Sequence, residues 1–214
     1  PAWSVGQVTA MHAMFQSATS FNQDLSAWDV SQVTGMRQMF NGANAFNQDL
    51  SNWDVGRVTS MRQMFIDANA FNRDLSTWDV SRVTTMSQMF NGANAFNGDL
   101  SAWNVGQVTD MEGMFQASPF NQDLSTWDVG QVTTMQSMFQ EASAFNGDLS
   151  AWDVSRVTTM YQMFNGANAF NRDLSTWDVG QVTTMHKMFF STASTAFNGD
   201  LSAWNVGQVT DMEG

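Results

Sequence analysis

Residues 46–70 read FNQDLSNWDVGRVTSMRQMFIDANA, and this unit recurs along the whole chain. Its tryptophan marks the period, because successive Trp residues are separated by 25, 25, 25, 25, 24, 25, 25 and 27 positions. A repeat of this length is typical of solenoids, since one unit cannot bury its apolar face alone whereas stacked units can. We therefore predict that residues 1–214 form a single solenoid of about eight repeats.

The amino-acid composition is skewed in the way expected when the residues of one short unit are repeated many times. The chain has 17 Met, 17 Phe and 9 Trp but one Tyr and no Cys, so disulfides and thiolate metal sites are excluded. A net charge of -12 argues against nucleic acid as a partner, because phosphate binding needs clustered Lys and Arg. No run approaches the roughly 20 apolar residues of a spanning helix, so we expect no membrane insertion.

The first half of the unit has the periodicity of a strand. Leu50, Trp53 and Val55 follow an L-x-x-L-x-L spacing, and Asp54 alternates between two apolar neighbours. Alternation of this kind places apolar side chains inside and the polar one outside. We predict a short strand around Trp53–Val55, with Asp54 pointing to solvent.

The second half has helical spacing. Val58, Met61, Met64 and Phe65 fall at i, i+3, i+6 and i+7, which predicts a short helix or helical turn, with Thr59 as its N-cap. Glycines follow the Met-Phe pair in several units, where a left-handed closing residue is expected. They are Gly42, Gly92 and Gly166.

The two irregular repeats differ from the others in the same stretch, between the Met-Phe pair and the next Phe-Asn. The short repeat contains Ser118-Pro119, and the long one contains residues 190–196. Because length changes collect where the chain loops at the surface, we predict a surface loop at this place in every unit.

The consensus FNxDLSxWDV(S/G)xVTxMxxMF resembles the repeat of the BspA-like leucine-rich-repeat surface proteins, and the resemblance covers the whole chain. It implies a leucine-rich-repeat-like solenoid, a right-handed coil with one short parallel strand and one short helix or helical turn per 25-residue rung. It also implies exposure at the cell surface or outside the cell, with adhesion or recognition as the role. It does not imply a particular ligand.

Residues at one position of the unit should form a ladder along the stack. An Asn ladder would satisfy backbone groups between rungs through its side-chain amides. Its members are Asn22, Asn47, Asn72, Asn97, Asn121, Asn146, Asn171 and Asn198.

An Asp row runs beside the Asn ladder, and its closely spaced carboxylates need compensation. Each carboxylate could accept backbone N–H groups in its own turn, or Ca²⁺ could bridge adjacent rungs. The row is Asp24, Asp49, Asp74, Asp99, Asp123, Asp148, Asp173 and Asp200. No cofactor is otherwise expected.

A second polar row follows the tryptophans and forms the outward face of the predicted sheet. This face is either simply solvated or a binding site for cations, amines or sugar hydroxyls. Its members, the candidate ligand-binding residues, are Asp29, Asp54, Asp79, Asn104, Asp128, Asp153 and Asp178, with Asn205 in the last unit.

A third row varies most between units, which predicts solvent exposure first and partner-specific chemistry second. It consists of the pairs His12-Ala13, Arg37-Gln38, Arg62-Gln63, Ser87-Gln88, Glu112-Gly113, Gln136-Ser137, Tyr161-Gln162 and His186-Lys187.

No catalytic site is expected. His12 and His186 lie in different units far apart, neither beside a nucleophile, and the paired carboxylates are equivalent copies rather than one unequal acid–base pair. The leading hypothesis is an extracellular or cell-surface recognition or adhesion module that binds protein or glycan through repeated faces. The alternatives are a structural spacer or filament subunit, with Ca²⁺ as a candidate stabiliser, and an ice- or mineral-binding surface. End-to-end self-association is a further candidate partnership. Thr77, Thr126 and Thr176 are too irregular a row to favour ice.

Residues 96–113 and 197–214 are identical in sequence, which suggests a duplicated block of four units. Solenoids usually end in polar capping units, and neither terminal unit here has that character. We expect the chain to be a segment of a longer array.

Overall fold

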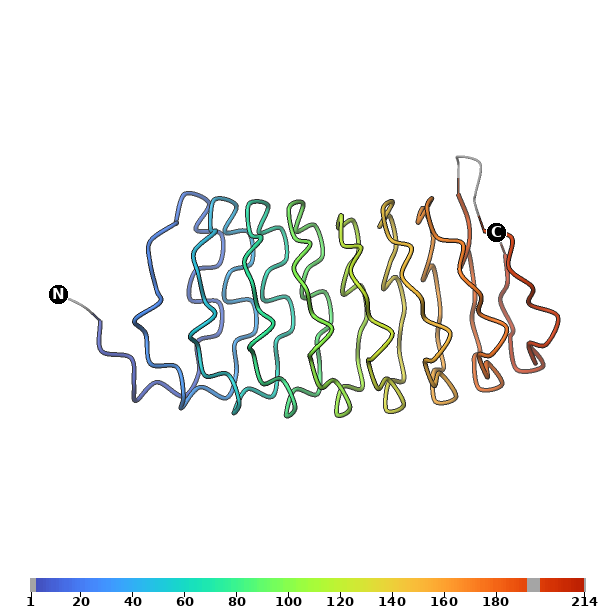
Figure 1. The fold of residues 1–214 in the computed structure, drawn as a ribbon, viewed down its shortest axis with the longest axis horizontal. Helices are drawn as coiled ribbons and strands as arrows, with labels where there is room; N and C mark the ends of the chain where they lie inside the picture. The colour runs from blue at the N-terminus through green and yellow to red at the C-terminus, as the bar shows by residue number, and fades with distance from the viewer. Residues whose placement is uncertain (1–2, 192–196, 214) are drawn as a thin grey trace.

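The computed structural model describes residues 3–191 and 197–213. These residues form one stack of rungs, with the first described rung at one end and the last at the other (Figure 1). Within the described residues, eight isolated parallel bridges connect each rung to the next, from Ala10–Gly35 to Thr184–Asp211. The predicted solenoid and its 25-residue rung are therefore confirmed.

The predicted helix is absent: the described residues contain neither a helix nor a continuous strand. The N–H groups of Met61, Gln63 and Phe65 donate to carbonyls of the following rung at 2.9–3.1 Å. They are consequently not available for the i−4 carbonyls that define an α-helix. The segment is instead a series of turns, in which Met64 donates to the carbonyl of Met61 at 3.1 Å.

Two positions of the turn segment have left-handed backbone in each of the first seven rungs. In the third rung they are Gln63, with φ of 58°, and Asp67, with φ of 54°. Gly42, Gly92 and Gly166 occupy the second of these positions, with φ of 66–73°, so the predicted left-handed conformation is confirmed. The conformation does not end a helix. It turns the backbone so that every second N–H, from Met61 to Asp67, points along the stack and donates to a carbonyl of the following rung.

The parallel pairing lies six residues after the centre of the predicted strand, Asp54. Ser60 forms the bridges of its rung, and the N–H of Thr59 donates to the carbonyl of Thr34 at 2.9 Å. Around Trp53 the backbone instead forms turn bonds, such as Trp53 N–H to the carbonyl of Leu50 at 3.0 Å. The predicted burial pattern is nevertheless confirmed: Trp53 and Val55 are buried, and Asp54 is exposed.

The core is a set of side-chain columns that run through the stack. Phe40 and Phe46 of one rung stack at 4.0 Å between centroids, and Phe40 stacks on Phe65 of the next rung at 5.5 Å. From Trp103 to Trp204 successive indoles are almost parallel, with centroids 6.4–6.5 Å apart. Stacked aromatic pairs contribute about 0.5–1.5 kcal/mol beyond the burial of their area.

Polar ladders fix the register of these columns. The N–H of each ladder Asn from Asn47 onward donates to the side-chain oxygen of the Asn in the preceding rung, at 2.8–3.1 Å. The predicted amide ladder is therefore confirmed. Each indole N–H from Trp53 onward donates to the Leu carbonyl of the preceding rung, at 2.9–3.1 Å.

The short repeat shows how a missing residue is absorbed. Ser118 takes the place that Ala93 and Ala142 have in regular rungs, and like them it is buried. Its hydroxyl accepts the N–H of Phe120 at 3.3 Å, so the chain turns back into the core one residue early. In the long repeat, residues 192–196 of the predicted loop lie outside the described residues.

Candidate functional site

The first Asp row is built from eight identical turns. The Oδ1 atom of each carboxylate accepts the N–H of the Ser two residues later at 2.8–2.9 Å, as in the Ser51 N–H bond to Asp49. The backbone bond and the Ser hydroxyl together hold the pKa of Asp49 below its usual value. The same causes lower the pKa of six other members, namely Asp24, Asp74, Asp123, Asp148, Asp173 and Asp200.

Repulsion along this row is visible but small beside the turn bonds. Asp49 and Asp148 raise the pKa of row neighbours, whereas Arg73 and Arg172 lower the pKa of Asp49 and Asp148 respectively. The described residues contain no group of three or more His, Cys, Asp or Glu side chains close enough to share a metal ion. The Ca²⁺ bridge, the alternative to the turn bonds, thus has no set of three protein carboxylates around it in the described residues, and it stays a hypothesis.

The second row uses the same turn on a neighbouring strip of the surface. Asp54 accepts the N–H of Gly56 at 3.1 Å, and Asp79 accepts the N–H of Ser81 at 3.0 Å. The remaining members make equivalent bonds at 3.0–3.2 Å. All eight side chains are exposed, so the row is held in one geometry yet open to solvent.

Two positions after each member of the second row the chain has either Ser or Gly, and this choice changes the pKa of the carboxylate and the space beside it. Where Ser follows, its hydroxyl is the main cause of a lowered pKa; these positions are Asp29, Asp79 and Asp153. Where Gly56 follows Asp54, a methyl group added to Gly56 would lie 3.3 Å from oxygens of both Asp54 and Asp79. The Gly positions therefore leave notches between carboxylates of adjacent rungs.

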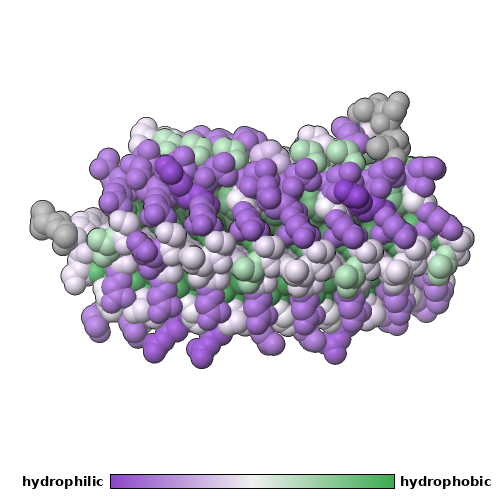
Figure 2. All heavy atoms as spheres, in the orientation of Figure 1, coloured by the Kyte–Doolittle hydropathy of each residue, from purple (hydrophilic) through white to green (hydrophobic). Residues whose placement is uncertain are grey.

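A shallow polar groove crosses the first Asp row in the middle of the stack. Asn121, Asp123, Asn146 and Asp148 line it together with Arg172. Gly147 forms its floor, because neighbouring rungs carry Gln122 and Arg172 at the position where this rung has no side chain. Hydrophilic side chains recur in such columns along the visible face of the molecule (Figure 2). Amides, carboxylates and a guanidinium are groups that can bind hydroxyl-rich ligands.

The variable row is less exposed than its sequence variation predicts. Ser87 and Ser137 are buried, with 3% and 7% of their surface exposed. The short side chains lie below the level of longer neighbours in adjacent rungs, such as Arg62 and Glu112. Variation here follows from the mixture of long and short side chains in one column, and only the long ones reach solvent.

The character of the variable row changes along the stack. Its first three rungs carry His12, Arg37 and Arg62, whereas near the other end Tyr161 stacks on His186 with centroids 5.2 Å apart. The Nδ1 atom of His186 lies 3.2 Å from a carboxylate oxygen of Asp211. In the same strip, the amide of Gln38 donates to the side chain of Gln63 at 2.8 Å.

Sequence reasoning missed a regular threonine row. Thr59 was predicted to cap a helix, but its hydroxyl donates to the carbonyl of Thr34 in the preceding rung at 3.2 Å. Equivalent bonds of 3.0–3.2 Å occur in every rung from Thr34 to Thr210, and all of these threonines are exposed. The invariant Thr after Val in every unit was the available signal. By contrast, Thr77, Thr126 and Thr176 donate to Ser carbonyls of the preceding rung.

The chain matches one known protein family along its length. The profile of the family described as Mycoplasma protein of unknown function, DUF285, matches residues 1–93, 72–157 and 117–214. No curated protein matches the chain. Among the described residues, no helix is long and apolar enough to cross a membrane.

Proposed function

This chain belongs to the family described as Mycoplasma protein of unknown function, DUF285, and because that description gives no function, we propose a role from the chemistry of the chain's surface. The proposal is a non-catalytic recognition or adhesion module, located outside the cell or at its surface, that binds a protein or glycan through repeated faces. The resemblance of the repeat to BspA-like leucine-rich-repeat surface proteins supports this location and role. The leucine-rich-repeat relationship and the right-handed coil are part of the proposal.

One observation carries it: the exposed polar rows are held rigid and in register. Each carboxylate of the post-Trp row is fixed by a turn bond of 3.0–3.2 Å, so a ligand meets a side chain that is already ordered. Pre-ordering lowers the entropic cost of binding. Equivalent patches at fixed spacing also allow many weak contacts to act together.

The chemistry of the rows favours a neutral or cationic polymer over an anionic one. Carboxylates and amides dominate both rows, and the net charge of -12 would repel an acidic ligand. A hydroxyl-rich glycan or a basic protein surface fits this pattern. In the middle of the stack, the groove between Asn121 and Arg172 brings amides, carboxylates and a guanidinium together.

Binding of the whole chain to arrays of glycans and surface proteins, with and without calcium, tests the proposal. For a captured partner, removing one complete unit, residues 46–70, shortens the stack while preserving the register of the remaining rungs. We expect affinity to fall with each unit removed, whereas Asp153→Ala alone changes it little. Full affinity in a chain of two rungs, or loss of binding through Asp153→Ala alone, would contradict repeated weak contacts.

A structural spacer or filament subunit is the second candidate. It is favoured by the continuous core, in which the Phe columns pass from Phe15 to Phe189 through all the intervening rungs. Such a stack gives length and stiffness without any lateral ligand. Absence of any captured partner in the array, together with association through the ends alone, would favour the spacer.

A further inference from the structure

Six asparagines of the chain are followed by glycine, a pair with intrinsic chemical reactivity. Asn is a thermolabile residue, because the backbone nitrogen of the next residue can attack its side-chain carbonyl carbon. Glycine has no Cβ and leaves that nitrogen unhindered. The six pairs fall in two columns of the stack. The pairs of the Asn ladder begin at Asn97, Asn146 and Asn198, and those of the turn segment begin at Asn41, Asn91 and Asn165.

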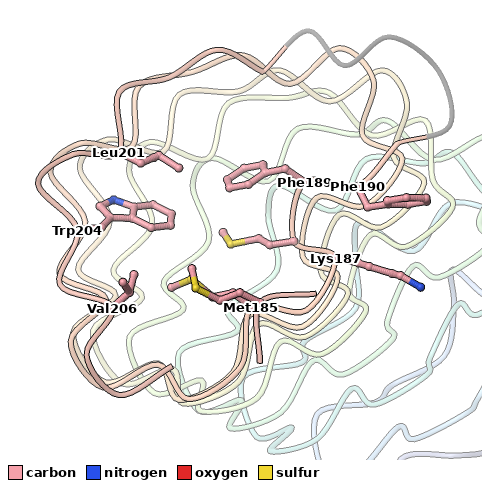
Figure 3. Close-up of a pocket in the computed structure, with 9 residues that line it drawn as sticks. Met185, Lys187, Phe189, Phe190, Leu201, Trp204 and Val206 are labelled. Carbon is pink, nitrogen blue, oxygen red and sulfur yellow. The ribbon is translucent and has the colours of Figure 1, made fainter. Parts of the chain in front are cut away.

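The ladder lies outside the apolar core. In the cross-section of a rung, Leu201 and Trp204 point inward toward Phe189 (Figure 3). By contrast, the side chain of Asn97 is exposed, and that of Asn146 is half-buried at the edge of the polar groove. Water can therefore reach both ladder asparagines.

The two columns differ in the bond that the glycine N–H makes. In the turn segment the glycine N–H donates along the stack at 2.8–2.9 Å, as Gly92 does to the carbonyl of Gln116. In the ladder, the N–H groups of Gly98 and Gly147 donate to no group among the described residues. A nitrogen that is held in a hydrogen bond must break it before it can attack, so the ladder glycines are the better nucleophiles.

The two columns also differ at the carbonyl that is attacked. The side-chain oxygen of Asn97 accepts the N–H of Asn121 at 2.8 Å, and that of Asn146 accepts the N–H of Asn171 at 3.1 Å. Attack places negative charge on this oxygen, and a fixed N–H that already points at it stabilises the charge. The side-chain oxygen of Asn91 accepts no hydrogen bond within the described part of the chain.

Within the ladder, the residue that follows Asn makes the difference. Asn121, one rung after Asn97, has the same ladder bond, because its side-chain oxygen accepts the N–H of Asn146 at 2.9 Å. It is followed by Gln122 instead of glycine, and the Gln side chain hinders the approach of the nitrogen. Asn121 is thus the matched internal comparison for Asn97.

From these contacts we propose that Asn97 and Asn146 are sites of spontaneous deamidation, selected by the hydrogen bonds of the ladder. The Gly98 nitrogen loses its proton to base and forms a bond to the side-chain carbon of Asn97. The C–N bond of the side-chain amide breaks, and ammonia leaves with a proton returned from solvent. Water then opens the cyclic imide at either carbonyl, which gives aspartate or isoaspartate. Water is the only co-reactant, and nothing is oxidised or reduced.

Both products alter the polar surface. Each adds a negative charge to the ladder, two residues before a member of the first Asp row. Isoaspartate also lengthens the main chain by one methylene group, just before the turn in which Asp99 accepts the N–H of Ser101 at 2.9 Å. In the polar groove, the amide of Asn146 becomes a carboxylate beside Asp148. The inference rests on the ladder bonds and does not depend on the proposed recognition role.

Incubation of the folded 214-residue chain at mildly alkaline pH, followed by trypsin digestion and mass spectrometry, tests the proposal. Trypsin releases residues 83–156 as one peptide, because this stretch contains no internal Lys or Arg. Its fragments distinguish Asn91, Asn97, Asn121 and Asn146. We expect Asn97 and Asn146 to be converted at least about tenfold faster than the other two. The rate should rise with pH, since the attacking nitrogen must lose its proton.

The same measurement in enough urea to unfold the chain separates structure from sequence. Asn91 and Asn97 are both followed by glycine, so without the ladder they should react at equal rates. Equal rates for these two residues in the folded chain would overturn the proposal. A preference for Asn97 that persists in the unfolded chain would assign it to local sequence and would overturn the proposal as well.

Gly98→Gln gives the matched variant, because it copies Gln122 of the next rung. It should stop conversion of Asn97 and leave the rate at Asn146 unchanged. Continued conversion of Asn97 in the folded variant would contradict attack by the Gly98 nitrogen. A Cβ at Gly98 would lie 3.3 Å from the ring of Phe96, so a thermal melt checks the fold, and Gly98→Ala repeats the test with a smaller side chain.

Discussion

Replacing Trp103 with alanine should damage the stack locally. The side chain of Trp103 is 3% exposed, its ring stacks on Trp127, and its N–H donates to the carbonyl of Leu75 at 2.9 Å. Truncation of a buried aromatic side chain costs about 3–5 kcal/mol, and the partial collapse of neighbouring rungs decides where in that range the cost falls. The carbonyl of Leu75 still accepts the N–H of Trp78 at 3.0 Å, so it is not left without a donor.

Two further variants divide this cost between packing and hydrogen bonding. Trp103→Phe keeps an aromatic ring in the column but removes the indole N–H, so about 1 kcal/mol of its loss should come from the hydrogen bond. Trp3→Ala is the control for position, because Trp3 is 65% exposed and covers only one neighbour. It should cost clearly less than Trp103→Ala in the same urea titration.

Hydrogen exchange measured by rung shows whether the loss is local. Contacts in a solenoid are made between nearest neighbours, so protection should fall most in the rungs of Trp78, Trp103 and Trp127. The Asn and Thr ladder N–H groups provide the probes in each rung. Equal loss of protection in all rungs would refute the reasoning, since it would mean that the stack unfolds as one unit.

Three other outcomes follow from the polar rows. Asn97→Ala removes the acceptor of the Asn121 N–H and should cost about 1 kcal/mol in thermal or urea unfolding; no measurable loss would mean that water replaces the amide. Acidification should destabilise the stack, because the pKa of Asp49 is lower in the folded chain than in the unfolded chain, where it is 3.8. The stability that this difference provides is present above pH 3.8 and is lost as the pH falls through the folded pKa. Asp49→Asn keeps the hydrogen-bond acceptor but does not titrate, so it should make the urea midpoint less sensitive to acid. Millimolar Ca²⁺ should leave the melting temperature unchanged, since turn bonds already compensate the first Asp row, and a clear rise would instead support the bridging ion.

The repeat and its core were predictable because burial depends on the pattern of side chains. Trp53, Val55, Met61 and Phe65 are buried as their spacing predicts, whatever local backbone connects them. Asp54 is exposed for the same reason. Periodicity of apolar residues therefore identified the columns of the solenoid and the inner face of each rung.

The backbone was not predictable from that pattern. Apolar residues at i, i+3 and i+7 fit a helix, but they also fit successive turns in which every second N–H bonds to the next rung. Gln63 and Asp67 have left-handed backbone, which their residue types do not predict. Their column partners Gly113 and Gly92 do carry that signal, so comparison between units, not within one, could have identified the turns.

For the candidate site, the hydrogen bonds within one unit could be predicted from the sequence, whereas the hydrogen bonds between rungs could not. The turn bonds of Asp49 and Asp54 are local, two residues apart, and follow from residue type. The Thr59 hydroxyl bond to Thr34 and the Trp53 bond to the carbonyl of Leu25 connect residues 25 and 28 positions apart. Such bonds depend on the stacking register, which only the three-dimensional arrangement supplies.

The orientation of the bonds between rungs has a mechanical consequence. They run along the axis of the stack, so a pull applied to the two ends is carried through every interface, and an end rung, which is bonded to one neighbour only, detaches first. Each rung that detaches releases 25 residues, or roughly 80 Å of extended chain. Under tension the protein would lengthen stepwise from its ends while its middle stays folded, as an extensible tether does.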